Sequence, residues 1–211
     1  MTFKEVIYGR RAVNFFDPKK PVPESLLNAV IEMAAQAPSG FNIQPWSLIV
    51  LRDQEEKLAL QKHAWNQTKI SEAPVTLIVL ADTEGWKTGN PFLEKNFQEM
   101  VRSGAMREDQ RQWFDKARES LYGASESRKV AFACKNTAFF AMSLMLAAKS
   151  LGVDTHPMDG FDIDAVRKEF KIPDNYWIPM LIAVGYFNTD QTLPPAKWRK
   201  TVDEITVRFD K

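Results

Sequence analysis

Apolar residues recur at helical spacing in several segments of the chain. The first residues, Met1–Tyr8, have the pattern of a short amphipathic helix. In Ser25–Ala37 the apolar residues lie three and four positions apart, which predicts a helix that ends at Pro38. Asp53 and Glu56 have the spacing of a capping box and predict a helix over Gln54–Ala64.

The longest apolar run, Thr137–Ala148, lies within a predicted helix over Arg128–Leu151 that Gly152 closes. The run is shorter than the roughly 20 apolar residues that a membrane-spanning helix needs. We therefore expect a central buried helix and no membrane association. A further helix is predicted over Asp162–Phe170, with Asp162 as its cap.

Three apolar segments read as buried strands: Ser47–Leu51, Pro74–Ala81 and Ile178–Phe187. Polar and apolar residues alternate in the tail Thr201–Phe209, which predicts an edge strand. Between these elements, about 82–127 is rich in charged residues with scattered bulky ones, as in a partly exposed helical excursion. We find no linker or repeat, so residues 1–211 are expected to form a single domain.

Composition and motifs exclude several functions. With 28 Lys and Arg against 27 Asp and Glu, the net charge of +1 gives no field that would recruit nucleic acid or an anionic membrane. Cys134 is alone, which excludes an internal disulfide and fits a reducing compartment, so we expect a cytoplasmic protein. The glycines form no dinucleotide or P-loop motif. His63 and His156 lack ligand spacing, so they are read as surface or loop residues, and no metal is expected.

The remaining polar residues that could carry chemistry are dispersed. The turn from Pro38 to Trp46 places Asn42 and Gln44 directly before a buried strand, which indicates either a ligand or an internal hydrogen-bond network. Arg10 with Arg11, and a late Lys and Arg pair, suit a phosphate, because phosphate prefers several charged donors. Paired arginines on a helix are also common as solvated surface.

These segments carry a family resemblance. The chain resembles the nitroreductase family of FMN-dependent oxidoreductases over nearly its full length, in five motifs. They are Ile7–Arg11, Ala37–Trp46, Gly152–Asp162, Ile172–Tyr186 and Lys197–Arg199. The resemblance implies an α+β nitroreductase-like fold with a central mixed β-sheet covered by helices. It also implies a homodimer formed through the long central helix, FMN sites at the interface, and a C-terminal extension that swaps onto the partner.

On this resemblance, each FMN site takes residues from both chains. The phosphate side would use Arg10, Arg11, Lys197 and Arg199, and the partner would supply Pro38, Ser39, Gly40 and Asn42. Asn66 and Lys69 would face the pyrimidine end of the flavin, where Lys69 would stabilise negative charge. Asp159 and Gly160 would bring a backbone N–H near flavin N5. Many members have Ser and a basic residue where this chain has Ala12 and Asn14, which also lie at the cofactor.

The resemblance also implies a reaction. Hydride would pass from NADPH or NADH to the flavin and then to a nitroaromatic, a quinone or a similar small acceptor, in a ping-pong sequence within one open pocket. No catalytic side chain is assigned, because the flavin carries the chemistry. Phe41, Trp113 and Phe114 are candidates to contact the acceptor, although Trp113 and Phe114 could equally pack the excursion onto the body.

Other functions remain open at this point. The same fold could reduce a narrower substrate, by dehalogenation, dihydropteridine reduction or enone reduction. A flavin-binding dimer without turnover, or a purely structural dimer, would also agree with the fold class alone.

Overall fold

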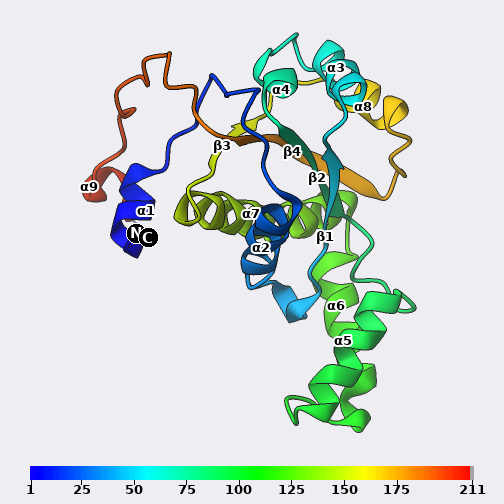
Figure 1. Ribbon diagram of the computed structural model, residues 1–211. Coiled ribbons are helices and arrows are strands. Elements are labelled where there is room, and N and C mark those ends of the chain that lie inside the picture. Colours follow the sequence, from blue (N-terminus) through cyan, green and yellow to red (C-terminus); the bar gives the residue numbers. More distant parts are fainter. Residues whose placement is uncertain (210–211) are drawn as a thin grey trace.

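The computed structural model describes residues 1–209 as helices packed on both faces of a four-stranded sheet (Figure 1). The strands are β1 (Trp46–Leu51), β2 (Val75–Asp82), β3 (Asp154–Met158) and β4 (Tyr176–Gly185), in the order β1-β2-β4-β3. All three pairings are antiparallel. The expected mixed sheet is therefore wrong for the named strands of one chain, because parallel pairing occurs in residues 1–209 only as the isolated bridge between Ala12 and Thr155.

Strand β2 explains why the sheet is covered on both faces. Its side chains alternate between two hydrophobic clusters: Leu77 and Val79 face one cluster, and Ile78 and Leu80 face the other. The first cluster includes residues of α2 (Glu24–Ala34) and α7 (Glu126–Ser150). The near-continuous apolar run is thus the expected pattern of a strand that is buried from both sides.

The predicted helices of the body are present with small shifts at their ends. They are α1 (Phe3–Gly9), α2, α3 (Gln54–His63), α7 and α8 (Ile163–Glu169), with a short α4 (Lys69–Glu72). The Asp53 carboxylate accepts from the backbone N–H groups of Glu55 and Glu56, which fixes the start of α3. Helices α3, α4 and α8 cover the face of the sheet opposite α7 (Figure 1).

Helix α7 corrects one expectation. With 25 residues it is long and apolar enough, by length and composition, to span a membrane. The argument that its apolar run is too short was therefore wrong, but the interpretation as a buried core helix is supported. Phe140, Ala141, Leu144 and Ala148 of α7 are buried in the first cluster against the sheet.

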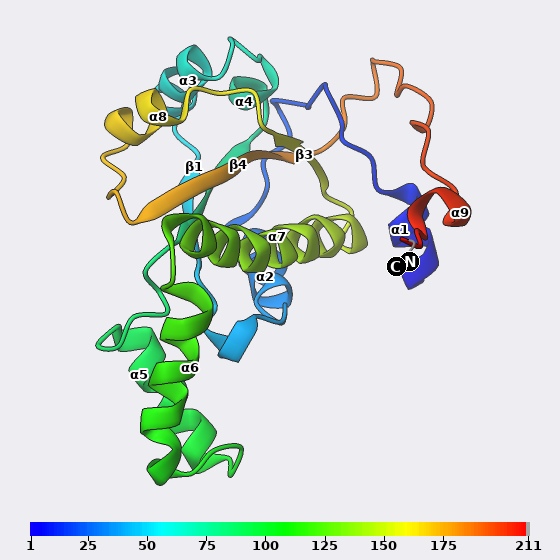
Figure 2. The same cartoon turned by 180° about the vertical axis from the view of Figure 1, so that it is seen from behind.

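The excursion at 82–127 is helical, as predicted, and projects away from the sheet (Figure 2). It contains α5 (Pro91–Arg102), the 3-10 turn η2 (Glu108–Gln110) and α6 (Arg111–Tyr122). The guanidinium of Arg111 in α6 donates to the carboxylate of Glu94 in α5 at 2.7 Å. Arg118 is fully buried, stacks 4.2 Å from the Phe114 ring and donates to the carbonyl of Trp86. The Arg111–Glu94 pair thus joins α6 to α5, and Arg118 joins α6 to the turn before α5.

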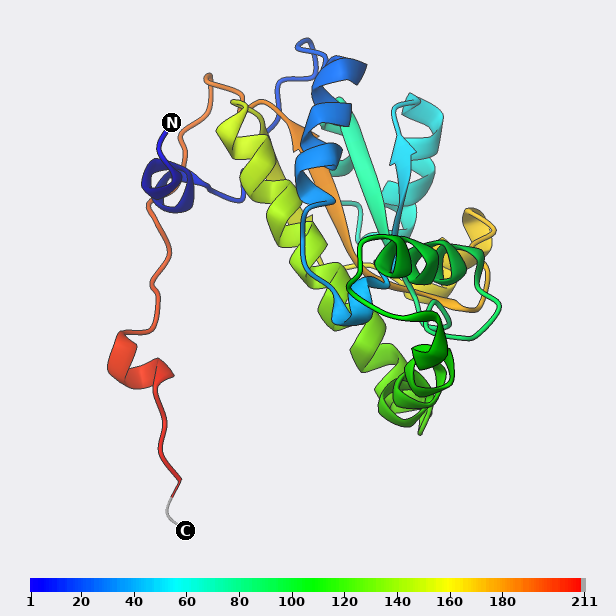
Figure 3. The same cartoon turned by 90° about the horizontal axis from the view of Figure 1, so that it is seen from below.

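The tail contradicts the expected edge strand. Thr201 caps a single helical turn, α9 (Val202–Ile205), and Thr201–Phe209 forms no strand. The tail runs away from the sheet (Figure 3), so no strand lies beside it to accept its hydrogen bonds. Val202, Ile205, Val207 and Phe209 are each more than 60% exposed. The apolar positions that suggested a strand have no cover within one chain.

Candidate active site

The structure brings the predicted phosphate residues together in one cavity of about 330 Å³. We call this cavity the basic pocket. Residues from both ends of the chain line it: Arg10, Arg11, Ala12, Asn14, His156, Pro157, Leu193, Pro194, Pro195, Lys197 and Arg199. The Arg11 guanidinium donates to the carbonyl of Pro194 at 2.8 Å, which ties the two ends of the chain to each other.

The basic pocket gathers several cations in one place. Within residues 1–209, none of Arg10, Arg11, Lys197 and Arg199 forms a salt bridge with a carboxylate. Burial lowers the pKa of Arg10, and the nearby positive charge of Arg199 lowers it further. Gathering like charges in this way costs free energy, which a bound anion would recover.

His156 is a residue of this site that the sequence did not reveal. It lines the basic pocket, and its Nδ1 lies 2.8 Å from the carbonyl oxygen of Val13. Burial lowers its pKa to about 4, with a further contribution from the positive charge of Lys69. The ring is therefore neutral near pH 7, Nδ1 donates to Val13, and Nε2 is left as an acceptor. The sequence signal that could have identified His156 is its position directly before Pro157 in the motif Gly152–Asp162.

Ala12 and Asn14, the two departures from the family pattern, line the wall of the basic pocket. Ala12 forms its bridge with Thr155 of β3 through the backbone, and Val13 N–H donates to the carbonyl of Thr155. Because these contacts use the backbone, this segment keeps its path without a hydroxyl at position 12.

Lys69 and Gly160 are connected through Gln67, a second residue that sequence patterns missed. The Gln67 amide donates to the Gly160 carbonyl at 2.9 Å and accepts from the Lys69 ammonium at 3.2 Å. Burial lowers the pKa of Lys69, against the opposing effect of Glu72. Nearby, Asn66 has a left-handed backbone, with φ of 54°. A polar amide in a loop carries no periodic signal, so only the fold could identify Gln67.

The Trp65 ring lies close against Gly160. A Cβ at this position would lie 2.7 Å from the ring, so a larger residue would displace the exposed Trp65 side chain. The resemblance accounts for Gly160 by a close approach of its backbone to the flavin. The contact with Trp65 is a second close approach at the same position, and Asp159 precedes Gly160 in the same turn.

The turn from Pro38 to Trp46 adopts an unusual backbone. Phe41, Asn42 and Gln44 have φ values of 52°, 53° and 53°. Such left-handed conformations cost L-residues roughly 1–2 kcal/mol each. Ser39 contributes to holding the turn, since its hydroxyl accepts from Gln44 N–H at 2.9 Å. Polar residues of the turn thus build an internal network, and strain of this kind is typical of functional sites.

The turn is anchored to the first half of α7. Gly40 N–H donates to the buried Asn136 side chain at 3.0 Å, and a Cβ on Gly40 would lie 2.5 Å from the Tyr122 hydroxyl. Gly9, next to Arg10, instead approaches the side chain of Lys149 near the other end of α7. Asn136 and Lys149 are 13 positions apart, or about 20 Å along the helix. A single chain therefore keeps the turn away from the basic pocket.

The three candidates for acceptor contact lie together. The Phe41 ring lies 6.2 Å from the Trp113 ring and 5.6 Å from the Phe114 ring, edge to face in both cases. Trp113 is 57% exposed, whereas Phe114 is fully buried. The burial of Phe114 corrects its place in the acceptor site and favours the alternative that it packs the excursion. Phe41 and Trp113 keep accessible surface.

Comparison with known proteins agrees with this geometry. Residues 7–186 match the model of the Nitroreductase family. An NADH dehydrogenase of Thermus thermophilus is 36% identical over 183 residues, covering 87% of this chain and 85% of the relative. MhqN of Bacillus subtilis, named as a candidate NAD(P)H nitroreductase, is 30% identical over 207 residues, covering 96% and 97%.

A solved structure supports the same assignment. A nitroreductase-type protein of Exiguobacterium sibiricum, crystallised in complex with FMN, has a TM-score of 0.83 and 25% identity. The match covers 98% of this chain and 96% of that one. The fold, the order of the motifs and the extent of the family match therefore agree, and the chain belongs to the nitroreductase family of oxidoreductases.

Proposed function

We propose that the protein is an NAD(P)H-dependent FMN oxidoreductase that reduces nitroaromatics, quinones or similar small acceptors. The single observation that carries the proposal is the basic pocket, where four cations lie together and form no salt bridge with a carboxylate of residues 1–209. The relatives add the donor and the cofactor, since they include an NADH dehydrogenase and a protein in complex with FMN.

The residues of the basic pocket fit the phosphate end of FMN. Arg10, Arg11, Lys197 and Arg199 offer guanidinium and ammonium donors, which bind phosphate strongly. The neutral His156 offers an acceptor at Nε2, which suits a hydroxyl group better than it suits an anion. When bound, FMN would supply the group that accepts hydride from NAD(P)H and returns electrons to the oxidised acceptor.

Lys69 would support the reaction electrostatically. Its ammonium is held by Gln67, which also holds the Gly160 turn, so the cation and the turn are fixed relative to each other. A fixed positive charge stabilises negative charge that develops beside it. Asn66 and Asp159 complete this part of the proposed flavin site. No side-chain acid or base is needed, because protons can come from water.

The proposed site is completed by a second copy of the chain. The turn that would line the flavin, with Pro38, Ser39, Gly40 and Asn42, is held by the first half of α7, away from the basic pocket. A homodimer would place the turn of one chain beside the basic pocket of the other. The exposed apolar residues of the tail, such as Val207 and Phe209, support a C-terminal extension that crosses to the partner.

The proposed order of binding is ping-pong. Phe41 and Trp113 would form an open aromatic wall where the nicotinamide and then the acceptor stack in turn. In residues 1–209 we find no dedicated set of polar anchors that would favour one narrow substrate. If the order is ping-pong, initial rates measured against NAD(P)H concentration at several fixed acceptor concentrations should give parallel double-reciprocal lines.

An absorption spectrum of the purified protein tests the proposal directly. Bound FMN should bleach on anaerobic addition of NADPH or NADH and recover on addition of a quinone or a nitroaromatic. Flavin that binds but does not bleach with either nucleotide would favour the non-catalytic flavin-binding dimer. A colourless protein that also fails to take up added FMN would overturn the cofactor assignment.

A further inference from the structure

Asn96 of α5 makes an unusual contact with the turn. Its side chain is buried, with 8% of its surface exposed. The side-chain N–H of Asn96 donates to the Phe41 carbonyl at 2.8 Å, and its oxygen accepts from the Asn42 amide at 2.9 Å. One amide thus satisfies an acceptor and a donor on two consecutive residues that both have left-handed backbones.

The other hydrogen bonds of the turn lie within it or connect it to α7. Asn42 N–H donates to the Ser39 carbonyl at 2.9 Å, the Gln44 amide donates to the Asn42 carbonyl at 3.4 Å, and Asn136 of α7 holds Gly40. Among the hydrogen bonds of residues 1–209, those of Asn96 are the ones that connect Phe41 and Asn42 to the excursion. The strained part of the turn is therefore tied to a residue about 50 positions away in the sequence.

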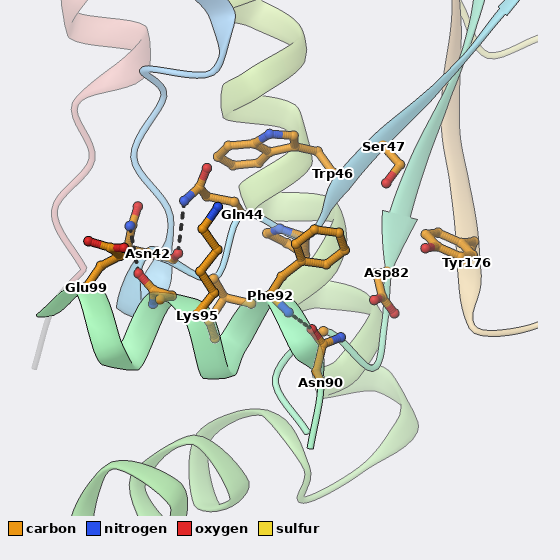
Figure 4. Close-up of a pocket in the computed structure, with 14 residues that line it drawn as sticks. Asn42, Gln44, Trp46, Ser47, Asp82, Asn90, Phe92, Lys95, Glu99 and Tyr176 are labelled. Carbon is orange, nitrogen blue, oxygen red and sulfur yellow. Dashed lines mark hydrogen bonds between the residues drawn. The ribbon is translucent and has the colours of Figure 1, made fainter. Parts of the chain in front are cut away.

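A cavity beside this contact increases the effect that loss of Asn96 would have on the turn. The cavity has a volume of about 390 Å³ and lies between the turn and α5. Figure 4 shows Asn42 and Gln44 of the turn on one side and Lys95 and Glu99 of α5 on the other. Because open space adjoins the turn, the backbone has room to relax once its hydrogen bonds to Asn96 are lost.

We propose that Asn96 is a positioning residue that holds Phe41 and Asn42 in the geometry needed to line the flavin of the partner chain. The proposal rests on the proposed function, in which Asn42 contacts FMN. Asn96 does not touch the cofactor and acts through the turn. The helical excursion would thereby set the shape of the flavin site as well as covering it.

Three variants separate positioning from general stability. Asn96→Leu keeps a side chain branched at Cγ and removes both hydrogen bonds. Asn96→Asp keeps an acceptor for Asn42 but places a carboxylate oxygen against the Phe41 carbonyl. The control is Asn90→Ala, which removes the N-cap of the same helix, where the Asn90 oxygen accepts from Phe92 N–H and Leu93 N–H. The control weakens α5 and leaves both contacts with the turn in place.

Hydrogen exchange of the cofactor-free protein is the first readout. We expect the amides of residues 40–44 to exchange about tenfold faster in Asn96→Leu, as the loss of two hydrogen bonds implies. Asn96→Asp should fall between Asn96→Leu and the parent, and Asn90→Ala should leave residues 40–44 unchanged. Equal exchange in parent and Asn96→Leu, or an equal rise in Asn90→Ala, would overturn the proposal. If Asn96→Leu does not fold, Asn96→Asp decides the question.

FMN affinity is the second readout. Asn96→Leu should weaken FMN binding about tenfold, and adding Asn42→Ala should weaken it little further, because both changes disrupt one contact. Full additivity of the two changes would contradict action through Asn42. If the parent protein binds no FMN, the proposed function fails, while hydrogen exchange still decides whether Asn96 holds the turn.

Discussion

The basic pocket and the turn beside the excursion use polar side chains in opposite ways. In the pocket, cations such as Arg10 and Arg199 lie close together, and no carboxylate of residues 1–209 pairs with them. Around the turn, the Asn42 amide donates to Asn96, which in turn donates to the Phe41 carbonyl, and Arg118 is buried against carbonyls and a carboxylate. The cations of the basic pocket are available to bind a ligand, whereas the hydrogen bonds around the turn stabilise its conformation.

The largest expected effect concerns the turn and the excursion that packs beside it. Phe114→Ala should destabilise the protein by about 3–5 kcal/mol, because the ring is fully buried in the core of the excursion. Trp113→Ala is the matched change at an exposed neighbour and should cost less than about 1 kcal/mol. Denaturant unfolding of both variants measures the difference. Similar losses for the two would mean that the excursion does not have the core described here.

Arg199→Ala should weaken FMN binding by roughly 10- to 100-fold, the range for one charged hydrogen bond. Its side chain donates only to the nearby carbonyls of Lys197 and Trp198 among residues 1–209, so little else should change. Without FMN, the variant should be at least as stable as the parent, because Arg10 loses a like charge. Lys200→Ala is the control, and titration with FMN is the measurement. Equal affinity in all three proteins would contradict the phosphate assignment.

Lys69→Ala should leave the protein folded and slow the reduction of bound flavin by about one order of magnitude. The effect should be smaller than the 10²–10³-fold loss seen for a preorganised oxyanion donor, because Lys69 is only partly buried. Lys69→Arg keeps the charge and should recover part of the rate. Anaerobic stopped-flow absorbance measures this step, and an unchanged rate in the alanine variant would remove Lys69 from the electrostatic role.

The last expected effect is a pH dependence of stability from His156. Its pKa is lowered from 6.5 to about 4 in the folded protein, so the unfolded chain binds more protons between these pH values. The stability contributed by neutral His156 is present above pH 6.5 and is lost as the pH falls toward 4. His156→Asn keeps a donor for the Val13 carbonyl without titrating. The unfolding free energy of the parent should fall more steeply than that of the variant over this interval.

The sequence was most informative where local pattern and fold agree. The apolar runs of β2 and β4 were found because both faces of the sheet are covered there, and β1 was found from its apolar run although Ser47 and Val50 are exposed. Strand β3 was missed, since Asp154–Met158 contains His and Pro and is too short to show a period. The tail was misread because alternation predicts a strand only if an edge is available to pair with it.

The residues of the candidate site also fall into two groups, those that sequence motifs could identify and those that only the fold reveals. Charged residues in family motifs, such as Arg10 and Arg199, could be identified and do lie together. Gln67, Asn96 and His156 could not, because their importance comes from contacts with residues distant in the chain. The burial of Phe114 is likewise a property of the folded excursion, and no pattern in 82–127 distinguishes it from exposed Trp113.

In the proposed dimer each flavin site combines the basic pocket of one chain with the turn of the other. The separation of these two parts along α7 of a single chain has a genetic consequence. On the proposed dimer, mutations of the basic pocket and mutations of the turn form two complementation groups. A cell that carries one allele of each kind assembles mixed dimers, in which one site combines both defects and the other site has neither. Two inactive alleles would then restore partial activity together, whereas two different alleles of the same group would not.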